Sequence, residues 1–202
     1  METLDEVIPY VPDTMLPKAI IVDVDGTVAL RNGRELYDWS RVGEDLPNQP
    51  VIDVIRSLWS YGVLRGDPVQ VIFMSGRPEE CRTQTELWLD ANVGLPFQLH
   101  MRSDGDFRQD WIIKDELFSL VRDKYCFLSA WDDRDQMAQY WRKLGLQCFQ
   151  VAEGKFLGGS YESQGKRWPG YRRECRQQPQ LRTAQARHLL AVLHLAGPGT
   201  AG

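Results

Sequence analysis

Two aspartates separated by one residue follow a short apolar segment near the start of the chain. Residues 19–22 are Ala-Ile-Ile-Val, which is typical of a strand buried on both faces, and Asp23, Asp25, Gly26 and Thr27 come directly after it. The carboxyl end of such a strand is where open α/β sheets bind ligands. Two carboxylates this close need a cation between them. A turn with two solvated acids is the alternative, but it does not explain the buried strand and Thr27 together.

Three further polar groups occur at comparable places along the chain. Ser75 and Arg77 follow the apolar segment 69–74, Lys114 lies near the start of an expected helix, and Asp132 and Asp133 follow the segment 126–131. Parallel strands would bring these groups to one sheet edge. Carboxylates that hold a metal or attack phosphorus, together with hydroxyls and cations that hold phosphoryl oxygens, indicate phosphoryl transfer.

The elements that would position these groups alternate regularly. Strands are expected at 19–22, 69–74, 97–101, 126–131 and 147–151. Helices are expected at 48–60, where Gly62, Gly66 and Pro68 break the pattern, at 78–91, at 110–123, and around Met137, Trp141 and Leu144. This order predicts an α/β fold with a Rossmann-like, mainly parallel sheet and helices on both faces. Core positions are expected for five tryptophans: Trp39, Trp59, Trp88, Trp111 and Trp141.

Charge divides the chain unevenly. Residues 155–202 carry eight Lys/Arg and two Asp/Glu, whereas the whole chain has a net charge of −4. We expect an N-terminal arm (1–17), a catalytic domain (18–157) and a basic C-terminal extension (158–202) with an amphipathic helix at 181–195. The extension could bind nucleic acid through its basic and aromatic residues, or act structurally, on the domain or in a homo-oligomer. Its apolar stripe favours the structural role.

Composition excludes several classes of protein. A hydrophobic content of 43% and a charged content of 26% are ordinary for a soluble globular protein, and no apolar run approaches the ~20 residues of a membrane span. The four cysteines lie far apart and no signal-peptide pattern opens the chain, which favours a reduced, cytoplasmic compartment. With only three histidines, the chemistry is expected from carboxylates.

The ordered motifs resemble the haloacid dehalogenase superfamily of phosphohydrolases. Asp23-Val24-Asp25-Gly26-Thr27, Ser75, Lys114 and Asp132-Asp133 are similar to its four motifs. Longer strings, among them DVDGTVALRNGRELYDW, VIFMSGRPEE and FRQDWIIKDELF, resemble the phosphatase half of phage polynucleotide kinase-phosphatases over about residues 18–156. The resemblance implies the same fold without a large cap domain, since only a turn and one helix are expected between Asp23 and Ser75.

The resemblance also implies roles for individual residues. Asp23 would be the nucleophile, Asp25 the general acid and base, and Ser75 and Lys114 would stabilise the phosphoryl group. Mg²⁺ would be held by Asp23, the backbone carbonyl of Asp25, and Asp132 or Asp133. Substrate or phosphate contacts would come from Thr27, Arg34, Arg77 and Asp110, with Asp110 also placed to orient Lys114 at i,i+4 spacing.

These roles predict a Mg²⁺-dependent polynucleotide 3′-phosphatase acting on DNA or RNA ends through an aspartyl-phosphate. The alternatives are a phosphatase of nucleotides or other small phosphate esters, and a phosphate-binding module without catalysis. The sequence contains no G-x-x-x-x-G-K-[ST] phosphate loop, which favours a free-standing phosphatase with a separate kinase or ligase as partner.

Overall fold

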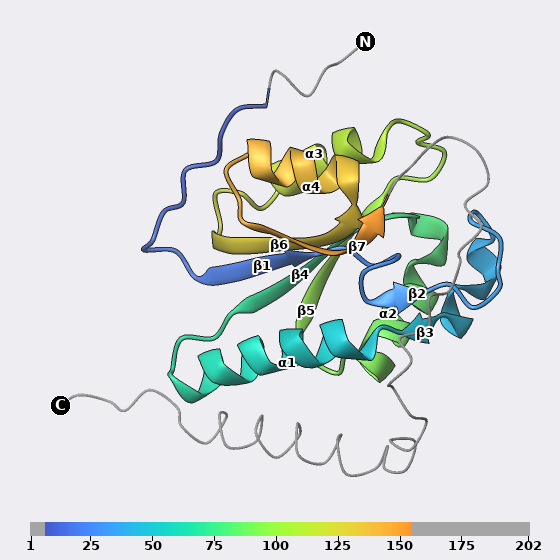
Figure 1. Cartoon of the computed structure of the whole chain (residues 1–202), viewed down its shortest axis with the longest axis horizontal. Helices are drawn as coiled ribbons and strands as arrows, with labels where there is room; N and C mark the ends of the chain where they lie inside the picture. Colours follow the sequence, from blue (N-terminus) through green and yellow to red (C-terminus); the bar gives the residue numbers. More distant parts are fainter. Residues whose placement is uncertain (1–6, 155–202) are drawn as a thin grey trace. The chain divides into compact units, whose positions relative to one another are not determined.

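The centre of the fold is a five-stranded sheet in which every neighbouring pair is parallel. In the computed structural model, which describes residues 7–154, the strand order is β5-β4-β1-β6-β7 (Figure 1). The strands are β1 (Lys18–Val22), β4 (Gln70–Pro78), β5 (Phe97–Arg102), β6 (Cys126–Arg134) and β7 (Cys148–Gly154). All five lie where the sequence predicted strands, and the predicted parallel sheet is confirmed.

Helices cover both faces of the sheet (Figure 1). One face packs under α3 (Asp110–Ser119) and α4 (Asp135–Lys143), where Phe118 and Trp141 meet alternate residues of β1 such as Ile21. The other face packs under α1 (Gln49–Leu64) and α2 (Arg82–Asn92), whose Trp59 and Trp88 meet the intervening residues. Because a central parallel strand is buried on both sides, β1 has the continuous apolar sequence that first identified it.

Three helices differ from their expected bounds, one of them because α3 ends at Ser119 and not at 123. Gly62 was expected to break the first helix, yet α1 continues to Leu64. A Cβ at Gly62 would lie 2.7 Å from the carbonyl oxygen of Asp67, so the glycine permits close packing inside the helix instead of ending it. The second helix begins not at Pro78 but with a 3₁₀ turn, η3 (Glu79–Cys81), before α2.

The segment between β1 and α1 contains more structure than the turn that was expected. Two short strands, β2 (Ala29–Leu30) and β3 (Leu46–Pro47), pair antiparallel, and the 3₁₀ helix η2 (Trp39–Glu44) precedes β3. Asn48 fixes this small sheet to the end of β1 through its amide, which donates to the carbonyl of Thr27 at 2.8 Å. The segment therefore forms a small, ordered shoulder beside the carboxyl edge of the main sheet.

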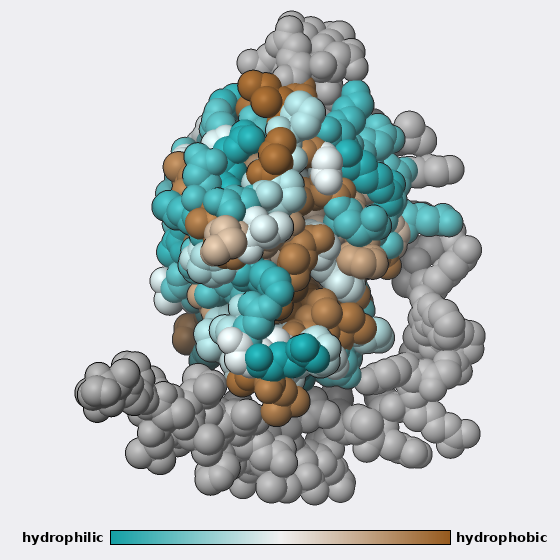
Figure 2. All heavy atoms as spheres, turned by 90° about the vertical axis from the view of Figure 1, so that its left-hand side faces the viewer, coloured by the Kyte–Doolittle hydropathy of each residue, from teal (hydrophilic) through white to brown (hydrophobic). Residues whose placement is uncertain are grey.

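The N-terminal segment of the described chain is held by one tyrosine. The Tyr10 hydroxyl donates to the carbonyl of Tyr125 at 2.8 Å and accepts from the N–H of Phe127 at 3.1 Å, and its ring packs edge-on against Phe118. Figure 2 faces the edge where the sheet strands begin and shows apolar atoms among polar ones there; Val11, Met15 and Leu64 are strongly exposed. This edge lies opposite the one that carries the predicted site residues.

The chain divides into two compact units, Met1–Gly159 and Ser160–Gly202. The predictions for the C-terminal extension, including its helix at 181–195, lie outside the described residues. Within the part of the chain that the structure describes, none of the helices is long and apolar enough to cross a membrane.

Candidate active site

The carboxyl ends of β1, β4 and β6, with the first turns of α3, bring together the residues predicted from the sequence. Lys114 lies at the centre, buried, and its ammonium bonds Asp23 Oδ1 at 2.7 Å and Asp132 Oδ2 at 2.8 Å. Asp110, one turn earlier on α3, lies 3.5 Å from the same ammonium. Burial alone would lower the pKa of Lys114, but the three carboxylates raise it well above its usual value, so the lysine is charged.

Asp23 is held at both of its carboxylate oxygens. Lys114 donates to Oδ1, and the Thr27 hydroxyl donates to Oδ2 at 3.4 Å. Burial raises the pKa of Asp23 well above its ordinary value, with the negative charges of Asp132 and Asp133 adding to the effect and Lys114 opposing it. A further positive charge beside these groups would therefore favour the ionised, nucleophilic form of Asp23.

Asp25 contacts a different set of groups. Arg77 donates to both of its oxygens, at 2.8 and 2.9 Å, and Arg34 donates to Oδ1 at 2.8 Å. Burial alone would raise the pKa of Asp25, but Arg77 and then Arg34 lower it below its ordinary value. In this structure Asp25 is consequently a carboxylate, and the two arginines fix its orientation.

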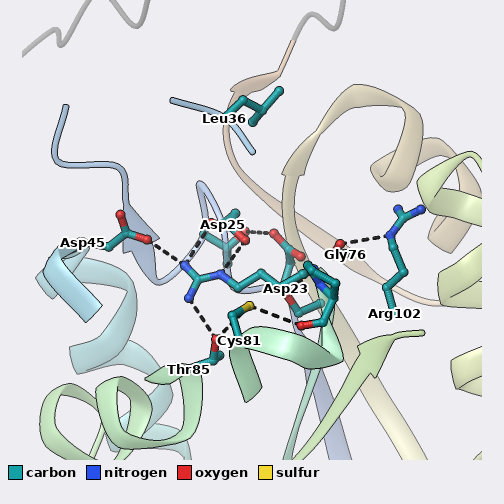
Figure 3. Close-up of polar contacts among 12 residues, drawn as sticks. Asp23, Asp25, Leu36, Asp45, Gly76, Cys81, Thr85 and Arg102 are labelled. Carbon is teal, nitrogen blue, oxygen red and sulfur yellow. Dashed lines mark hydrogen bonds and ion pairs between the residues drawn. The ribbon is translucent and has the colours of Figure 1, made fainter. Parts of the chain in front are cut away.

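Both arginines are themselves held by Asp45, which the sequence analysis did not identify. The Asp45 carboxylate is buried and accepts from Arg34 at 2.8 Å through each oxygen and from Arg77 at 2.7 Å. Figure 3 shows Asp45 and Asp25 on opposite sides of a guanidinium group, with Thr85 below it. Asp45 precedes β3 in the unexpected shoulder, and no motif or periodicity in the sequence points to it.

The sequence predicted substrate or phosphate contacts for Arg34 and Arg77. Their side chains are almost completely buried and bond to Asp25 and Asp45, so the two arginines hold the Asp25 carboxylate in place. Their contact with substrate or phosphate stays a prediction. Arg34 comes from the segment after β2, and Arg77 comes from the end of β4.

Ser75 and the turn that follows it form the floor of the site. The Ser75 hydroxyl oxygen accepts from the N–H of Arg77 at 3.1 Å, which leaves the hydroxyl hydrogen for another acceptor. A Cβ at Gly76 would lie 2.5 Å from Asp110 Oδ1, so only glycine allows this turn to approach α3. Arg102 ties the two together, donating to the Gly76 carbonyl at 2.9 Å and to Asp110 Oδ1 at 3.2 Å.

A substrate contact of Asp110 stays a prediction, while its expected place beside Lys114 at i,i+4 spacing is what the structure shows. Asp110 faces Lys114, Arg102 and, at 3.4 Å, Arg134, so it orients cations of the site. The sequence analysis did not assign roles to Arg102 and Arg134. Each is the last residue of a strand, β5 for Arg102 and β6 for Arg134, and that position could have identified them. Arg108, by contrast, is paired with Asp106 and Glu116 on the outer surface.

Three carboxylates could hold a metal ion. Oxygens of Asp23, Asp132 and Asp133 lie within 4.8 Å of one another. Asp133 Oδ1 is buried without a hydrogen-bond partner within residues 7–154, and burial and the charge of Asp132 raise the pKa of Asp133 to about 7. A buried carboxylate oxygen without a donor is costly, and a hard cation would satisfy it.

The glycine of the first motif allows Asp133 to approach this place. Gly26 has φ of +84°, and a Cβ there would lie only 2.1 Å from Asp133 Oδ2. The donor set is entirely oxygen, as Mg²⁺ prefers. The residues therefore fit a magnesium ion.

Comparison with known proteins shows the family of the chain. Residues 17–156 match the family model of the polynucleotide kinase PNKP phosphatase domain. The chain is 33% identical over 141 residues, 68% of its length, to a putative bifunctional polynucleotide kinase/RNA ligase of Autographa californica nuclear polyhedrosis virus. It is similar to chains in two solved structures of the Pnkp1/Rnl/Hen1 RNA repair complex, each with a TM-score of 0.65 and 39% identity over 75% of this chain.

The similarity is confined to part of each relative. This chain spans 20% of the viral protein and 48% and 51% of the two chains of solved structure. The resemblance to this family that the sequence motifs indicated is confirmed.

Proposed function

This chain belongs to the family of polynucleotide kinase phosphatase domains, since residues 17–156 match its model, and we propose that it removes phosphate from the 3′ ends of polynucleotides through Asp23. As a member of that family it is a phosphatase. The observation that best supports the finer proposal is the contact of Lys114 with both Asp23 and Asp132. It orients the buried Asp23 carboxylate, which can receive a phosphoryl group, and places a positive charge beside it.

In the first step, an oxygen of Asp23 attacks the phosphorus of the ester. The new oxygen–phosphorus bond forms as the bond to the 3′ oxygen breaks, and that oxygen leaves with a proton from Asp25. Lys114 and the Thr27 hydroxyl contact Asp23, and both are suited to hold the phosphoryl oxygens. The Ser75 hydroxyl, on the neighbouring strand β4, is suited to the same role. The product is an aspartyl-phosphate and a free 3′ hydroxyl.

Asp25 needs a proton for that step, although its two arginines favour the carboxylate. The arriving phosphate carries a charge of about −1.5 to −2. This negative charge disfavours the ionised form of Asp25 and therefore favours uptake of a proton by its carboxylate. Because Arg34 and Arg77 are held by Asp45, they keep the Asp25 carboxyl in one orientation in both of its protonation states.

In the second step, Asp25 is the carboxylate that its surroundings favour. It accepts a proton from a water molecule, whose oxygen attacks phosphorus, and the bond to Asp23 breaks to release inorganic phosphate. Asp23 returns to its ionised form and Asp25 is again protonated, ready for another leaving group. The lowered pKa of Asp25 keeps it in the ionised form, which can accept a proton in this step.

The magnesium ion would be held by Asp23, Asp132 and Asp133, with the backbone carbonyl of Asp25 as a further ligand implied by the family resemblance. When bound it would supply positive charge to the phosphoryl group and its attacking oxygen. The magnesium ion would also offset the excess of negative charge at the site. Four carboxylates (Asp23, Asp110, Asp132, Asp133) face three cations (Lys114, Arg102, Arg134) before a phosphate adds its own negative charge.

The access to Asp23 supports a large substrate. Between Asp23 and Ser75 the chain forms only β2, η2, β3 and α1, and β2 and β3 contribute two residues each. Within residues 7–154 no cap domain covers this edge, so a nucleic-acid terminus could reach it. A mononucleotide or another small ester is the alternative substrate. A polynucleotide kinase or ligase is the partner favoured by the relatives, a putative kinase/RNA ligase and a Pnkp1/Rnl/Hen1 complex.

A phosphate-release assay tests the proposal. Wild type in Mg²⁺ should release phosphate from a 3′-phosphate oligonucleotide faster, in kcat/KM, than from a 5′-phosphate oligonucleotide or a 3′-mononucleotide. Asp23→Asn should remove the activity while preserving the fold, because the amide has the same shape but is not a nucleophile. A preference for the mononucleotide would support the small-ester alternative and reject the polynucleotide assignment.

A further inference from the structure

An exposed tyrosine lies next to the arginine cluster that holds Asp25. Tyr37 is 74% exposed, and its ring meets that of Trp39 at a centroid distance of 6.0 Å and an angle of 72°. Trp39 in turn lies 5.7 Å from the guanidinium carbon of Arg34, the residue that donates to Asp25. A continuous series of contacts therefore leads from the Asp25 carboxyl through Arg34 and Trp39 to the exposed ring of Tyr37.

The backbone that carries Tyr37 is fixed by the same arginine. Arg34 Nη1 donates to the carbonyls of Glu35 and Leu36 at 3.4 and 3.3 Å, and the N–H of Asp38 closes a turn on the carbonyl of Glu35 at 3.2 Å. Because Arg34 is anchored on Asp45, the turn is anchored too. An exposed aromatic ring on an anchored turn is prepared for binding without a large entropic cost.

The expectation that Trp39 belongs to the core is only partly correct. Trp39 is half-buried and packs beside Val42, Cys81 and Met101, a small cluster apart from the main core. The other four tryptophans are buried as expected. Trp39 thus supports Tyr37 from below, and the steep angle between the rings leaves a face of Tyr37 open to a planar ligand.

We propose that Tyr37, supported by Trp39, is a stacking platform for a nucleobase at or next to the phosphorylated end of the substrate. This inference rests on the proposed function and extends it, since it assigns the site a contact with the base as well as with phosphate. A base has a flat π-face whatever its identity, so such a platform holds polynucleotide ends without reading their sequence. It also favours a nucleotide end over a phosphate ester that lacks a base.

Another tyrosine of the same chain supplies a matched control. Tyr61 is 61% exposed, and Arg65 lies 5.7 Å from its ring, a pairing like that of Trp39 with Arg34. Tyr61 lies near the C-terminal end of α1, beside the loop that leads into the start of β4. It is therefore at the opposite end of the strands from Asp25, with the same chemistry and no access to the site.

The test compares two kinds of 3′-phosphate oligonucleotide, one with all its bases and one made abasic at the last or the next-to-last nucleotide. In Tyr37→Ala the ratio of kcat/KM for the intact over the abasic substrate should fall about 5- to 100-fold, as expected for one lost base stack. Tyr37→Phe should keep the wild-type ratio because the ring remains, and Tyr61→Ala should keep it too. An equal loss on the intact and both abasic substrates, or no loss on any, overturns the proposal.

Binding measured without turnover separates this proposal from the proposed function. Titration of a 3′-hydroxyl single strand against wild type and Tyr37→Ala, followed by tryptophan fluorescence, should show about the same 5- to 100-fold difference in Kd. If wild type releases no phosphate from oligonucleotides but this difference persists, the 3′-phosphatase assignment fails and the platform stands. If turnover is normal and the Kd values are equal, the platform fails alone.

Discussion

The removal of one charge at Asp45 should disturb both stability and catalysis, although Asp45 lies outside every motif. Its carboxylate is buried and accepts three hydrogen bonds from two buried guanidinium groups at 2.7–2.8 Å. Asp45→Asn keeps the shape but removes the charge and turns an N–H₂ group toward a guanidinium. Arg34 and Arg77 would then share only the charge of Asp25.

The size of the effect follows from that burial. Loss of one partner from a buried ion pair costs about 3–5 kcal/mol, because the remaining charge stays buried without compensation. For a chain of this length, each kcal/mol lowers Tm by about 2–4 °C, so a decrease of about 6–20 °C is expected. Asp25 would lose its fixed orientation, and a misplacement of about 1 Å costs on the order of 100-fold in rate.

Thermal unfolding by circular dichroism and phosphate release measure the two effects. The control is Asp53→Asn, since Asp53 is an exposed acid on α1 that pairs with Arg56 at 3.5 Å, and exposed pairs contribute about 0–1 kcal/mol. Its Tm should stay within about 4 °C of wild type. If Asp45→Asn unfolds at the wild-type temperature and retains activity within about threefold, Asp45 does not organise the arginines and this reasoning is refuted.

Two further predictions concern the carboxylates around Asp133. The affinity for Mg²⁺, measured by calorimetry, should increase as pH rises from about 6 to 8, because the ion binds the ionised carboxylate and the pKa of Asp133 is raised to about 7. A flat profile over that range would contradict the assignment of Asp133 as a ligand. Gly26→Ala should weaken Mg²⁺ binding and lower Tm, because its Cβ would lie 2.1 Å from Asp133 Oδ2 at a φ of +84°. Gly33→Ala, also at positive φ but with open space around it, controls for backbone strain alone and should leave Mg²⁺ affinity intact.

Much of this fold could be predicted from local patterns. Apolar runs such as that before Asp23 indicate buried strands, and their alternation with helices predicts a mainly parallel sheet but not the order of its strands. The contact of Lys114 with Asp23, 91 residues away, was implied by the family resemblance. Helix ends were less predictable, since packing permits Gly62 inside α1.

The shoulder between β1 and α1 was not predictable in the same way. Its strands have two residues each, too few for any periodicity, and its order depends on contacts with distant residues such as Arg77. Asp45 therefore looked like any polar loop residue in the sequence. A sequence shows the charges of Arg34 and Arg77 but not the carboxylates of Asp25 and Asp45 that surround them, so these ion-pair partners were not predicted.

The most direct test of the central claim is a search for phosphate on Asp23 during turnover. A 3′-phosphate oligonucleotide with a radiolabelled terminal phosphate is mixed with wild type in Mg²⁺ and quenched in acid within one turnover, and the protein is digested and mapped. The account predicts transient label on the peptide that contains Asp23 and none in Asp23→Asn. Label on another residue, or phosphate released at the full rate by Asp23→Asn, would contradict it.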